Sequence, residues 1–393
     1  MQETQSIHPI FISSIRLFGF RTYHEIEVSI ERSVVVLFGN NGVGKTNFLE
    51  AVSMLSAGKG FRRAYARDIA RCKEDGWSVS SRFLDSDYHN RFLTVFSRDD
   101  MGKGRYFSVD GNCIKHADVG NYISVIWLTP FMDQLWVGGA AERRKFFDRI
   151  VLSFYPKHAV NIMLYTKVMQ ERNMLLRQEQ RGVWLDAIDN RIAAIGTEIV
   201  KARVRTVDLL NRKINKEESI FPDMKVSVDG KWEKTYIELA NDELWAEGVE
   251  GKVRNLFTRF LFDGRSRDAR MKRTMEGPHL SDIKVKHLAK ECFAGECSTG
   301  EQKLLLVGVV LACVRAVGCF RGVFPLLVLD ELVAHLDERW RRVLLEELLL
   351  SGSQVFISGI RQSHFDSLHN SAQLYHVMYD DGVSYLHEAE GIL

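Results

Sequence analysis

The sequence has little net charge and lacks the cysteine spacing of a zinc site. A net charge of +2 over 393 residues creates no global basic field, so any contact with nucleic acid must come from local clusters of cations. The six cysteines form no pair of C-x-x-C units, and the five-residue step from Cys292 to Cys297 is a poor metal spacing. We therefore expect mainly buried free thiols, which suit a protein of the reducing cytoplasm. The six cysteines are Cys72, Cys113, Cys292, Cys297, Cys313 and Cys319.

A leader and a membrane-spanning run are also missing. The N-terminal residues MQETQSIHPIF have neither the basic nor the apolar region of a signal peptide. The longest apolar run, Leu304 to Val314, is too short to cross a bilayer and ends at Arg315. There is no low-complexity tract and no internal repeat. These absences predict a soluble protein with no membrane partner.

The pattern of apolar residues divides the chain into three parts. Residues 11–38 read as strands, and a helix is expected from Thr46 to about Ser56. Residues 77–128 alternate as antiparallel strands do, whereas residues 141–216 have sparse glycine and helical spacing. From Glu276 to the end, alternating strands and helices return.

This order predicts an α/β fold with an insertion. The two ends of the chain are expected to form one nucleotide-binding α/β domain, residues 1–140 together with 274–393. Residues 141–273 are expected to form a mostly helical inserted second domain.

The stretch GNNGVGKT fits the phosphate-binding loop pattern G-x-x-x-x-G-K-[ST], with a buried strand before it and a helix after it. Its glycines let backbone amides surround phosphates, and the helix N-terminus adds a favourable field. Lys45 would supply positive charge to the β- and γ-phosphates, and the Thr46 hydroxyl would ligate Mg²⁺. The alternative is a chance glycine-rich turn. We predict that ATP and Mg²⁺ bind this loop, which comprises Gly39, Asn40, Asn41, Gly42, Val43, Gly44, Lys45 and Thr46.

A second candidate site follows the apolar strand FPLLVLDEL. Asp330 at the end of this strand would hold Mg²⁺, directly or through water. Glu331 would then polarise the water that attacks the γ-phosphate. The alternative is an acidic pair that only favours the start of a helix.

The stretch CSTGEQ opens directly into a long apolar helix. A hydroxyl, a glycine and unpaired amides at a helix start can bind an anion, so Ser298 and Gly300 could cover a γ-phosphate held by another copy of the chain. The alternative is an ordinary helix cap, with Ser298 or Thr299 as the cap and Glu301 completing a capping box. Both interpretations stay open at this point.

Several stretches together resemble the ABC-type ATPases. STGEQ with its helix, LLVLDEL, and AHLD from Ala334 to Asp337 are similar to the signature motif, the Walker B strand and the D-loop of that group. Within it the chain resembles the RecF family of bacterial recombination-repair ATPases over nearly its full length. The further matches, in order, are LFGFRTY, GKGFRR, LTPFMDQLWVGGAAERRKFFDR, QERNMLL and EGPHLSDI.

The resemblance implies a fold, an activity and partners. The fold would be an ABC-type ATPase head, and two copies would join head to tail on ATP, with each signature loop closing over the partner's nucleotide. Asp337 would then contact nucleotide, and Lys45 and Glu331 would serve catalysis. The family further implies binding to duplex or gapped DNA, RecR- and RecO-type partner proteins, and loading of the RecA recombinase in DNA repair, DNA replication and the SOS response.

The chain departs from the family pattern in three respects. Leu280 and Ser281 stand where the family has Arg and Asp. The acidic residue expected directly after Pro130 comes only at Asp133. His364 lies too far along for the switch histidine that many ABC ATPases have. The last departure predicts a slow ATPase.

Three basic clusters are candidate contacts to DNA phosphates. FRRAYAR contains Arg62, Arg63 and Arg67, and the other two clusters are ERRK and RSRDARMKR. No helix resembles a base reader, so any preference should be for DNA structure rather than sequence. The alternative for each cluster is a solvated face, and ERRK could instead support the core through acidic partners.

Three other function classes fit parts of the sequence. A transporter ATPase subunit would share the phosphate-binding loop, but the long helical insert argues against it. A coiled-coil chromosome ATPase would need heptads over hundreds of residues, which the insert lacks. A nucleotide-gated scaffold with little turnover stays open, because tight binding does not require hydrolysis.

Overall fold

The computed structural model describes residues 8–71, 74–84, 89–101, 104–178, 182–214, 221–241 and 243–389. The chain divides into two compact units. One unit joins Met1–Asp133 to Cys313–Leu393, and the other comprises Gln134–Ala312.

The first unit contains a six-stranded sheet in the order β17-β16-β4-β15-β14-β9. Four adjacent strands, β4, β15, β14 and the edge strand β9, are parallel and consist of buried apolar residues, apart from the last residues of β15. Strands covered on both faces need such continuous apolar runs, which the sequence showed. The strands are β4 (Val34–Phe38), β9 (Val125–Leu128), β14 (Leu326–Leu329), β15 (Val355–Gly359), β16 (Ala372–Asp380) and β17 (Val383–Ala389).

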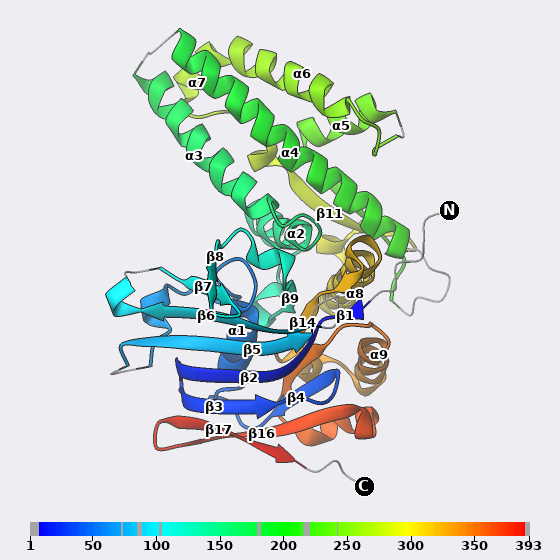
Figure 1. Cartoon of the computed structure of the whole chain (residues 1–393). Helices are drawn as coiled ribbons and strands as arrows, with labels where there is room; N and C mark the ends of the chain where they lie inside the picture. The colour runs from blue at the N-terminus through cyan, green and yellow to red at the C-terminus, as the bar shows by residue number, and fades with distance from the viewer. Residues whose placement is uncertain are drawn as a thin grey trace. The chain divides into compact units, whose positions relative to one another are not determined.

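A second six-stranded sheet in this unit is antiparallel, with the order β3-β2-β5-β6-β7-β8. In β5 and β6 buried residues alternate with more exposed ones, as expected when only one face of a sheet is covered. Helix α1 (Lys45–Met54) contacts strands of both sheets and lies behind β5 and β6 in Figure 1. The strands are β2 (Phe11–Phe20), β3 (Tyr23–Ser29), β5 (Gly76–Leu84), β6 (Asn90–Arg98), β7 (Tyr106–Val109) and β8 (Asn112–Ile114).

Shorter elements complete the first unit. Helix α9 (Glu338–Leu349) packs against the 3₁₀ segment Gln362–Ser371, and β1 (His8–Pro9) pairs with β13 (Val323–Phe324). Other 3₁₀ turns occupy Ala66–Asp68, Asp99–Met101, Val119–Asn121, Pro130–Met132 and Leu332–His335.

The second unit is mostly helical. Helices α3 and α4 pack side by side, and α4 also contacts α5 and α6 (Figure 1). A small sheet of order β10-β11-β12 accompanies them. The helices are α2 (Ala140–Phe154), α3 (His158–Arg177), α4 (Val183–Ile214), α5 (Lys231–Ala240), α6 (Val249–Asp263) and α7 (Arg265–Met271), and the strands are β10 (Met224–Asp229), β11 (Asp282–His287) and β12 (Cys292–Phe293).

The α/β fold with a helical insertion is confirmed, but the compact units have other bounds than the predicted domains. The predicted insert ended at residue 273, yet β11 pairs along its whole length with β10 inside the insert. Main-chain pairing therefore carries the second unit on to Ala312. The assignment of ATPase and insert functions to these segments stays a prediction.

Helix α8 (Thr299–Arg321) is longer than the apolar run that indicated it. It begins in the second unit and ends in the first. By length and mean hydropathy (2.1) it could cross a membrane, but 78% of that window is buried inside the protein. Such burial is the arrangement of a core helix, in agreement with the sequence-based expectation.

The thiols follow the expectation only in part. The described cysteines are free, but only Cys313 is buried, while Cys113 and Cys319 are exposed. Cys72 lies outside the described residues.

Buried arginines hold the second unit together. Arg172 is fully buried and bonds the carboxylates of Asp189 at 2.6 Å and Asp268 at 2.7 Å. Arg203, 2% exposed, makes two bonds of 2.9 Å to Asp148 and one of 3.3 Å to Glu233. Each guanidinium therefore joins helices through several hydrogen bonds, which a buried charge requires.

We expect Arg203→Met to destabilise the second unit by about 3 kcal/mol or more, because it leaves carboxylates buried without a cation. Arg212→Met is the control, since Arg212 is 63% exposed and pairs with Asp208 one turn away; its removal should cost under about 0.5 kcal/mol. Urea unfolding of the second unit, followed by circular dichroism, measures both. Equal losses would contradict the role given to Arg203.

The ion pair between Arg203 and Asp148 should make the stability of the second unit depend on pH. Burial raises the pKa of Asp148, but the charge of Arg203 and the hydrogen bond from His158 outweigh it and hold that pKa below its ordinary value. A depressed carboxyl pKa adds stability above the unfolded-state pKa that is lost as the pH falls through the folded value. The difference between wild type and Arg203→Met should therefore shrink in acid.

Candidate functional site

The phosphate-binding loop lies where the sequence placed it, between β4 and α1 at the carboxyl end of a parallel strand. Gly44 has φ 112°, in the left-handed region that favours glycine. A Cβ at Gly44 would lie 2.3 Å from Ser384 Oγ. Any side chain at Gly44 would displace the loop. At Gly42, by contrast, a Cβ would meet no atom within 4 Å, so of these two glycines only Gly44 is limited by close packing.

Lys45 is the first residue of α1 and lies inside the loop. Its side chain is only 3% exposed, and Nζ donates hydrogen bonds to the carbonyls of Gly39 (2.8 Å) and Asn40 (2.7 Å). Burial lowers the pKa of Lys45, and the charges of Glu331 and Asp330 oppose that shift. The loop thus holds a cation next to its own amides and beside two carboxylates.

Asp330 directly follows β14 and is 5% exposed. Its Oδ1 accepts hydrogen bonds from Thr46 Oγ1 at 3.1 Å and from Ser358 Oγ at 2.8 Å. Burial raises the pKa of Asp330, and these two hydrogen bonds act against the shift. A hydroxyl and a carboxylate in contact form the oxygen donor set that Mg²⁺ prefers, so Thr46 and Asp330 fit the predicted metal site.

Glu331 has the left-handed conformation φ 51°, which non-glycine residues adopt mainly under constraint. Its backbone N–H donates to Ser358 Oγ at 2.9 Å. Ser358 therefore bonds both members of the Asp330–Glu331 pair. The sequence analysis missed Ser358, although a serine that ends a buried apolar strand was a visible signal.

Residues from both ends of the chain brace the loop. Ser384 Oγ donates to Val43 O at 2.7 Å and lies 2.6 Å from Thr22 Oγ1. Tyr23 OH donates to Gly44 O at 3.0 Å. Ser384 belongs to β17, so the last strand of the chain helps to shape a loop more than 300 residues earlier. The sequence analysis did not identify these residues either.

Asp337 does not join this group of contacts. Its side chain caps α9, accepting a hydrogen bond from the Trp340 backbone N–H at 2.9 Å. The predicted nucleotide role of Asp337 stays a prediction.

In the second unit, Ser298 caps α8, which is the helix-cap interpretation of the CSTGEQ stretch. Its N–H and Oγ–H both donate to Glu301 Oε2, at 3.1 and 2.9 Å, and Glu301 N–H returns a 3.5 Å bond to Ser298 Oγ. The hydrogen bond from Lys290, followed by those from Ser298, lowers the pKa of Glu301 to about 2. The capping box is therefore confirmed, and Ser298, Thr299 and Gly300 themselves are exposed.

Gly300 lies in open space, because a Cβ there would meet no atom within 4 Å. The fold of this unit therefore gives no packing reason for glycine at this position. Nearby, Cys292 Sγ and Cys297 Sγ are 3.4 Å apart, and burial raises the pKa of Cys297 to about 11.

The structure shows the surroundings of the positions that depart from the family pattern. Ser281 Oγ donates to the fully buried Glu233 at 2.7 Å, whereas Leu280 is 53% exposed. His364 lies in a 3₁₀ segment, and burial, then Arg341, lowers its pKa. Asp133 is the capping residue after the turn Pro130–Met132.

The basic clusters differ in how far acidic partners engage them. In ERRK, Arg143 pairs with Asp282 through two bonds of 2.8 Å, and in RSRDARMKR, Arg265 pairs with Asp186 and Asp189. These arginines support the fold, as the alternative interpretation held for ERRK. Arg62 bonds Asn47 at 2.7 Å and Glu50 at 3.2 Å.

The two other predicted DNA contacts lie on the surface. Arg63 is exposed, and the Arg67 side chain is 68% exposed and 3.5 Å from Asp68. Their role in binding DNA stays a prediction.

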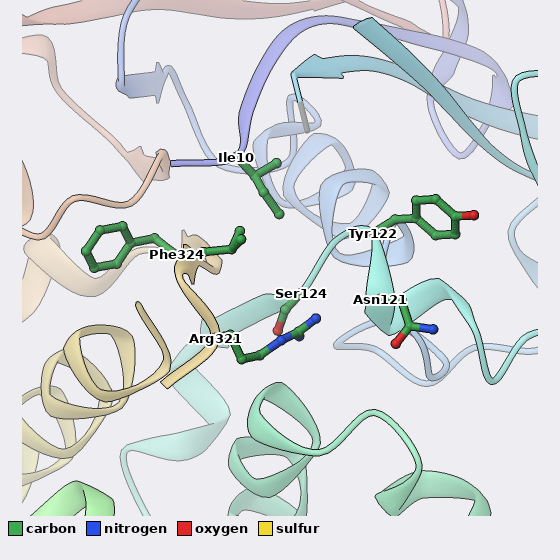
Figure 2. Close-up of a pocket in the computed structure, with 7 residues that line it drawn as sticks. Ile10, Asn121, Tyr122, Ser124, Arg321 and Phe324 are labelled. Atoms are coloured by element: carbon green, nitrogen blue, oxygen red, sulfur yellow. The ribbon is translucent and has the colours of Figure 1, made fainter. Parts of the chain in front are cut away.

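A separate pocket of about 200 Å³ lies near the opposite ends of the strands (Figure 2). Ser124 precedes β9 and Phe324 precedes β14, so the pocket is at the amino edge of the parallel sheet, while the phosphate-binding loop and Asp330 are at its carboxyl edge. Arg321 in this pocket donates to Gly120 O at 2.9 Å. Because ligands of open α/β sheets bind at the carboxyl edge, the loop, not this pocket, is the candidate nucleotide site.

Comparison with known proteins shows the family to which the chain is similar. The sequence profile described as the RecF/RecN/SMC N terminal domain matches residues 11–384. A protein of Rhizobium rhizogenes (strain K84) described as DNA replication and repair protein RecF is 36% identical over 377 residues, covering 95% of this chain and 98% of the relative. The RecF of Mesorhizobium japonicum is 39% identical over 367 residues, covering 92% and 94%.

Solved structures show the same fold at lower identity. A structure described as the recombination mediator protein RecF-ATPrS in the RecFOR pathway has a TM-score of 0.80 at 21% identity, covering 97% of this chain and 99% of the other. The Smc head domain of Pyrococcus furiosus, bound to the C-terminal domain of ScpA, has a TM-score of 0.56 at 15% identity, covering 97% and 96%.

We expect Ser358→Ala to lower the rate of ATP hydrolysis roughly tenfold, because losing a hydrogen bond to a charged group costs about 1.5 kcal/mol. Ser353→Ala is the control: this buried serine precedes the same strand, and its hydroxyl donates to Pro325 O at 2.7 Å. Phosphate release is measured under saturating ATP. The same loss in both variants would indicate a packing effect and contradict a role for Ser358 at the site.

Proposed function

The chain belongs to the RecF family, within the RecF/RecN/SMC group, and on that basis we propose that it is an ATP-dependent DNA-binding protein of recombinational repair and replication-fork maintenance. It acts in the cytoplasm, forms a homodimer on ATP at gapped or duplex DNA, and assists loading of RecA together with RecR- and RecO-type proteins. The observation that carries the proposal is the contact of Thr46 with Asp330 beside the buried Lys45.

The nucleotide site follows from these contacts. The amides of Gly39 to Thr46 and the ammonium of Lys45 would hold the phosphates of ATP, and Thr46 with Asp330 would hold Mg²⁺. Bound ATP with Mg²⁺ supplies a phosphoanhydride whose hydrolysis can drive a change of state. Glu331 would orient the attacking water and accept its proton. Hydrolysis would be slow, because Ile360 and Arg361, not a histidine, directly follow β15, and His364 lies in the 3₁₀ segment Gln362–Ser371.

The exposed start of α8 supports the ATP-driven dimer. Ser298 and Gly300 lie exposed at a helix N-terminus, where Ser298 is bonded to Glu301 and the space at Gly300 is open. In a head-to-tail dimer this surface would close on the γ-phosphate bound by the other copy, and Asp337 would contact nucleotide. ATP would thereby link two copies that otherwise separate.

We expect Gly300→Asp to abolish ATP-driven dimerisation while leaving the fold intact. A carboxylate in the first turn of a helix is favourable by about 0.3–1 kcal/mol, and the space at Gly300 is open, but the negative charge would repel a γ-phosphate. Gly300→Ala is the matched control for the loss of glycine. Sedimentation with and without ATP, on a Glu331→Gln background that slows turnover, measures the dimer; a normal dimer of Gly300→Asp would overturn this role of α8.

Membership of the RecF family argues against a transporter subunit. Single-turnover kinetics distinguishes an ATPase from a scaffold that binds ATP with little turnover. Glu331→Gln should bind ATP as wild type does and lower single-turnover hydrolysis by at least about 100-fold, the usual contribution of a general base. Equal rates for the two proteins, at whatever level, would show that Glu331 is not the base and would favour the scaffold.

A further inference from the structure

The segment between α1 and β5 contains a basic loop, defined here as residues 58–68. It carries four cations, Lys59, Arg62, Arg63 and Arg67, and one carboxylate, that of Asp68, which lies 3.5 Å from Arg67. Such a cluster attracts phosphates even though the whole chain is nearly neutral.

The loop is held at both ends, so its surface has a defined shape. Phe61 N–H donates to Ser53 Oγ at 3.2 Å at one end. At the other end Trp77 Nε1 donates to Ala66 O at 2.7 Å, and Arg21 Nη1 donates to Asp68 O at 2.6 Å. The exposed side chains between these anchors are thus presented from an ordered backbone.

Tyr65 is the aromatic residue of this loop that projects from it. It is 66% exposed, while its carbonyl accepts a 2.9 Å bond from Asp68 N–H. Lys59 Nζ lies 5.5 Å and Arg67 Cζ 5.7 Å from the centre of its ring. Both cations lie over the ring, and the loop therefore combines a largely exposed aromatic side chain with two nearby cations.

This combination selects a class of ligand. Proteins that bind single-stranded nucleic acid place cations along the backbone and stack bases on aromatic rings. In a continuous duplex each base face is covered by its neighbours, so a duplex offers phosphates to the cations but no free face to Tyr65. An acidic peptide would likewise engage only the cations.

We propose that the basic loop binds DNA with an unpaired base stacked on Tyr65, and that this contact makes the protein prefer gapped DNA over continuous duplex. Arg63 and Arg67 hold the adjoining phosphates. The inference rests on the proposed DNA-binding function and adds to it the feature of the DNA that is recognised.

The test compares fluorescence anisotropy of the full chain with ATP on two labelled DNAs of equal length, one continuous duplex and one with a single-stranded gap. Tyr65→Ala should weaken binding to the gapped DNA by about tenfold and change duplex binding less than twofold. Tyr65→Trp should keep the preference, because a larger ring stacks at least as well. Arg63→Gln should weaken binding to both DNAs and reduce its salt dependence.

Phe92→Ala is the matched control, because Phe92 is 46% exposed with Arg82 4.8 Å from its ring centre but belongs to β6. It should leave both affinities unchanged. Equal weakening on both DNAs by Tyr65→Ala, or none on either, overturns the stacking proposal while DNA binding stands. Wild type that binds neither DNA with ATP overturns the proposed function itself.

Discussion

The candidate site depends on one chain of hydrogen bonds that runs from Thr46 through Asp330 to Ser358. Thr46 and Asp330 come after β4 and β14, and Ser358 lies in β15, which pairs in parallel with both of these strands. A buried carboxylate needs such partners, since leaving it without them would cost several kcal/mol. The bonds that satisfy Asp330 therefore also fix the phosphate-binding loop against the strand that carries Glu331.

The loop itself is shaped by parts of the chain that are remote in sequence. Ser384, from the last strand, bonds Val43 and lies against Gly44, while Tyr23 bonds the Gly44 carbonyl. A hydrogen bond from Ser384 and a steric limit at Gly44 act on neighbouring residues. The C-terminal hairpin thus contacts the candidate nucleotide site and is not only an edge of the sheet.

The second unit depends on buried arginines that are paired with acidic side chains. Arg172 and Arg203 are buried, and each is satisfied by carboxylates and carbonyls from several elements. Because the acidic partners come from separate helices, these arginines set how the helices join. The start of α8 is left exposed, with Ser298 occupied as a cap and open space around Gly300.

Local pattern in the sequence was enough to indicate the strands β4 and β14, the phosphate-binding loop and the Asp330–Glu331 pair, because each depends on residues within a few positions of one another. It also indicated the α/β fold with its helical insertion, and it offered the cap at Ser298 as one of two interpretations. Tertiary structure alone decided that Ser358 and Ser384 contact these residues, that β11 joins the second unit, and that Arg143 of ERRK pairs with Asp282 while Tyr65 is exposed. These outcomes depend on which distant segments meet, and spacing along the chain carries no record of that.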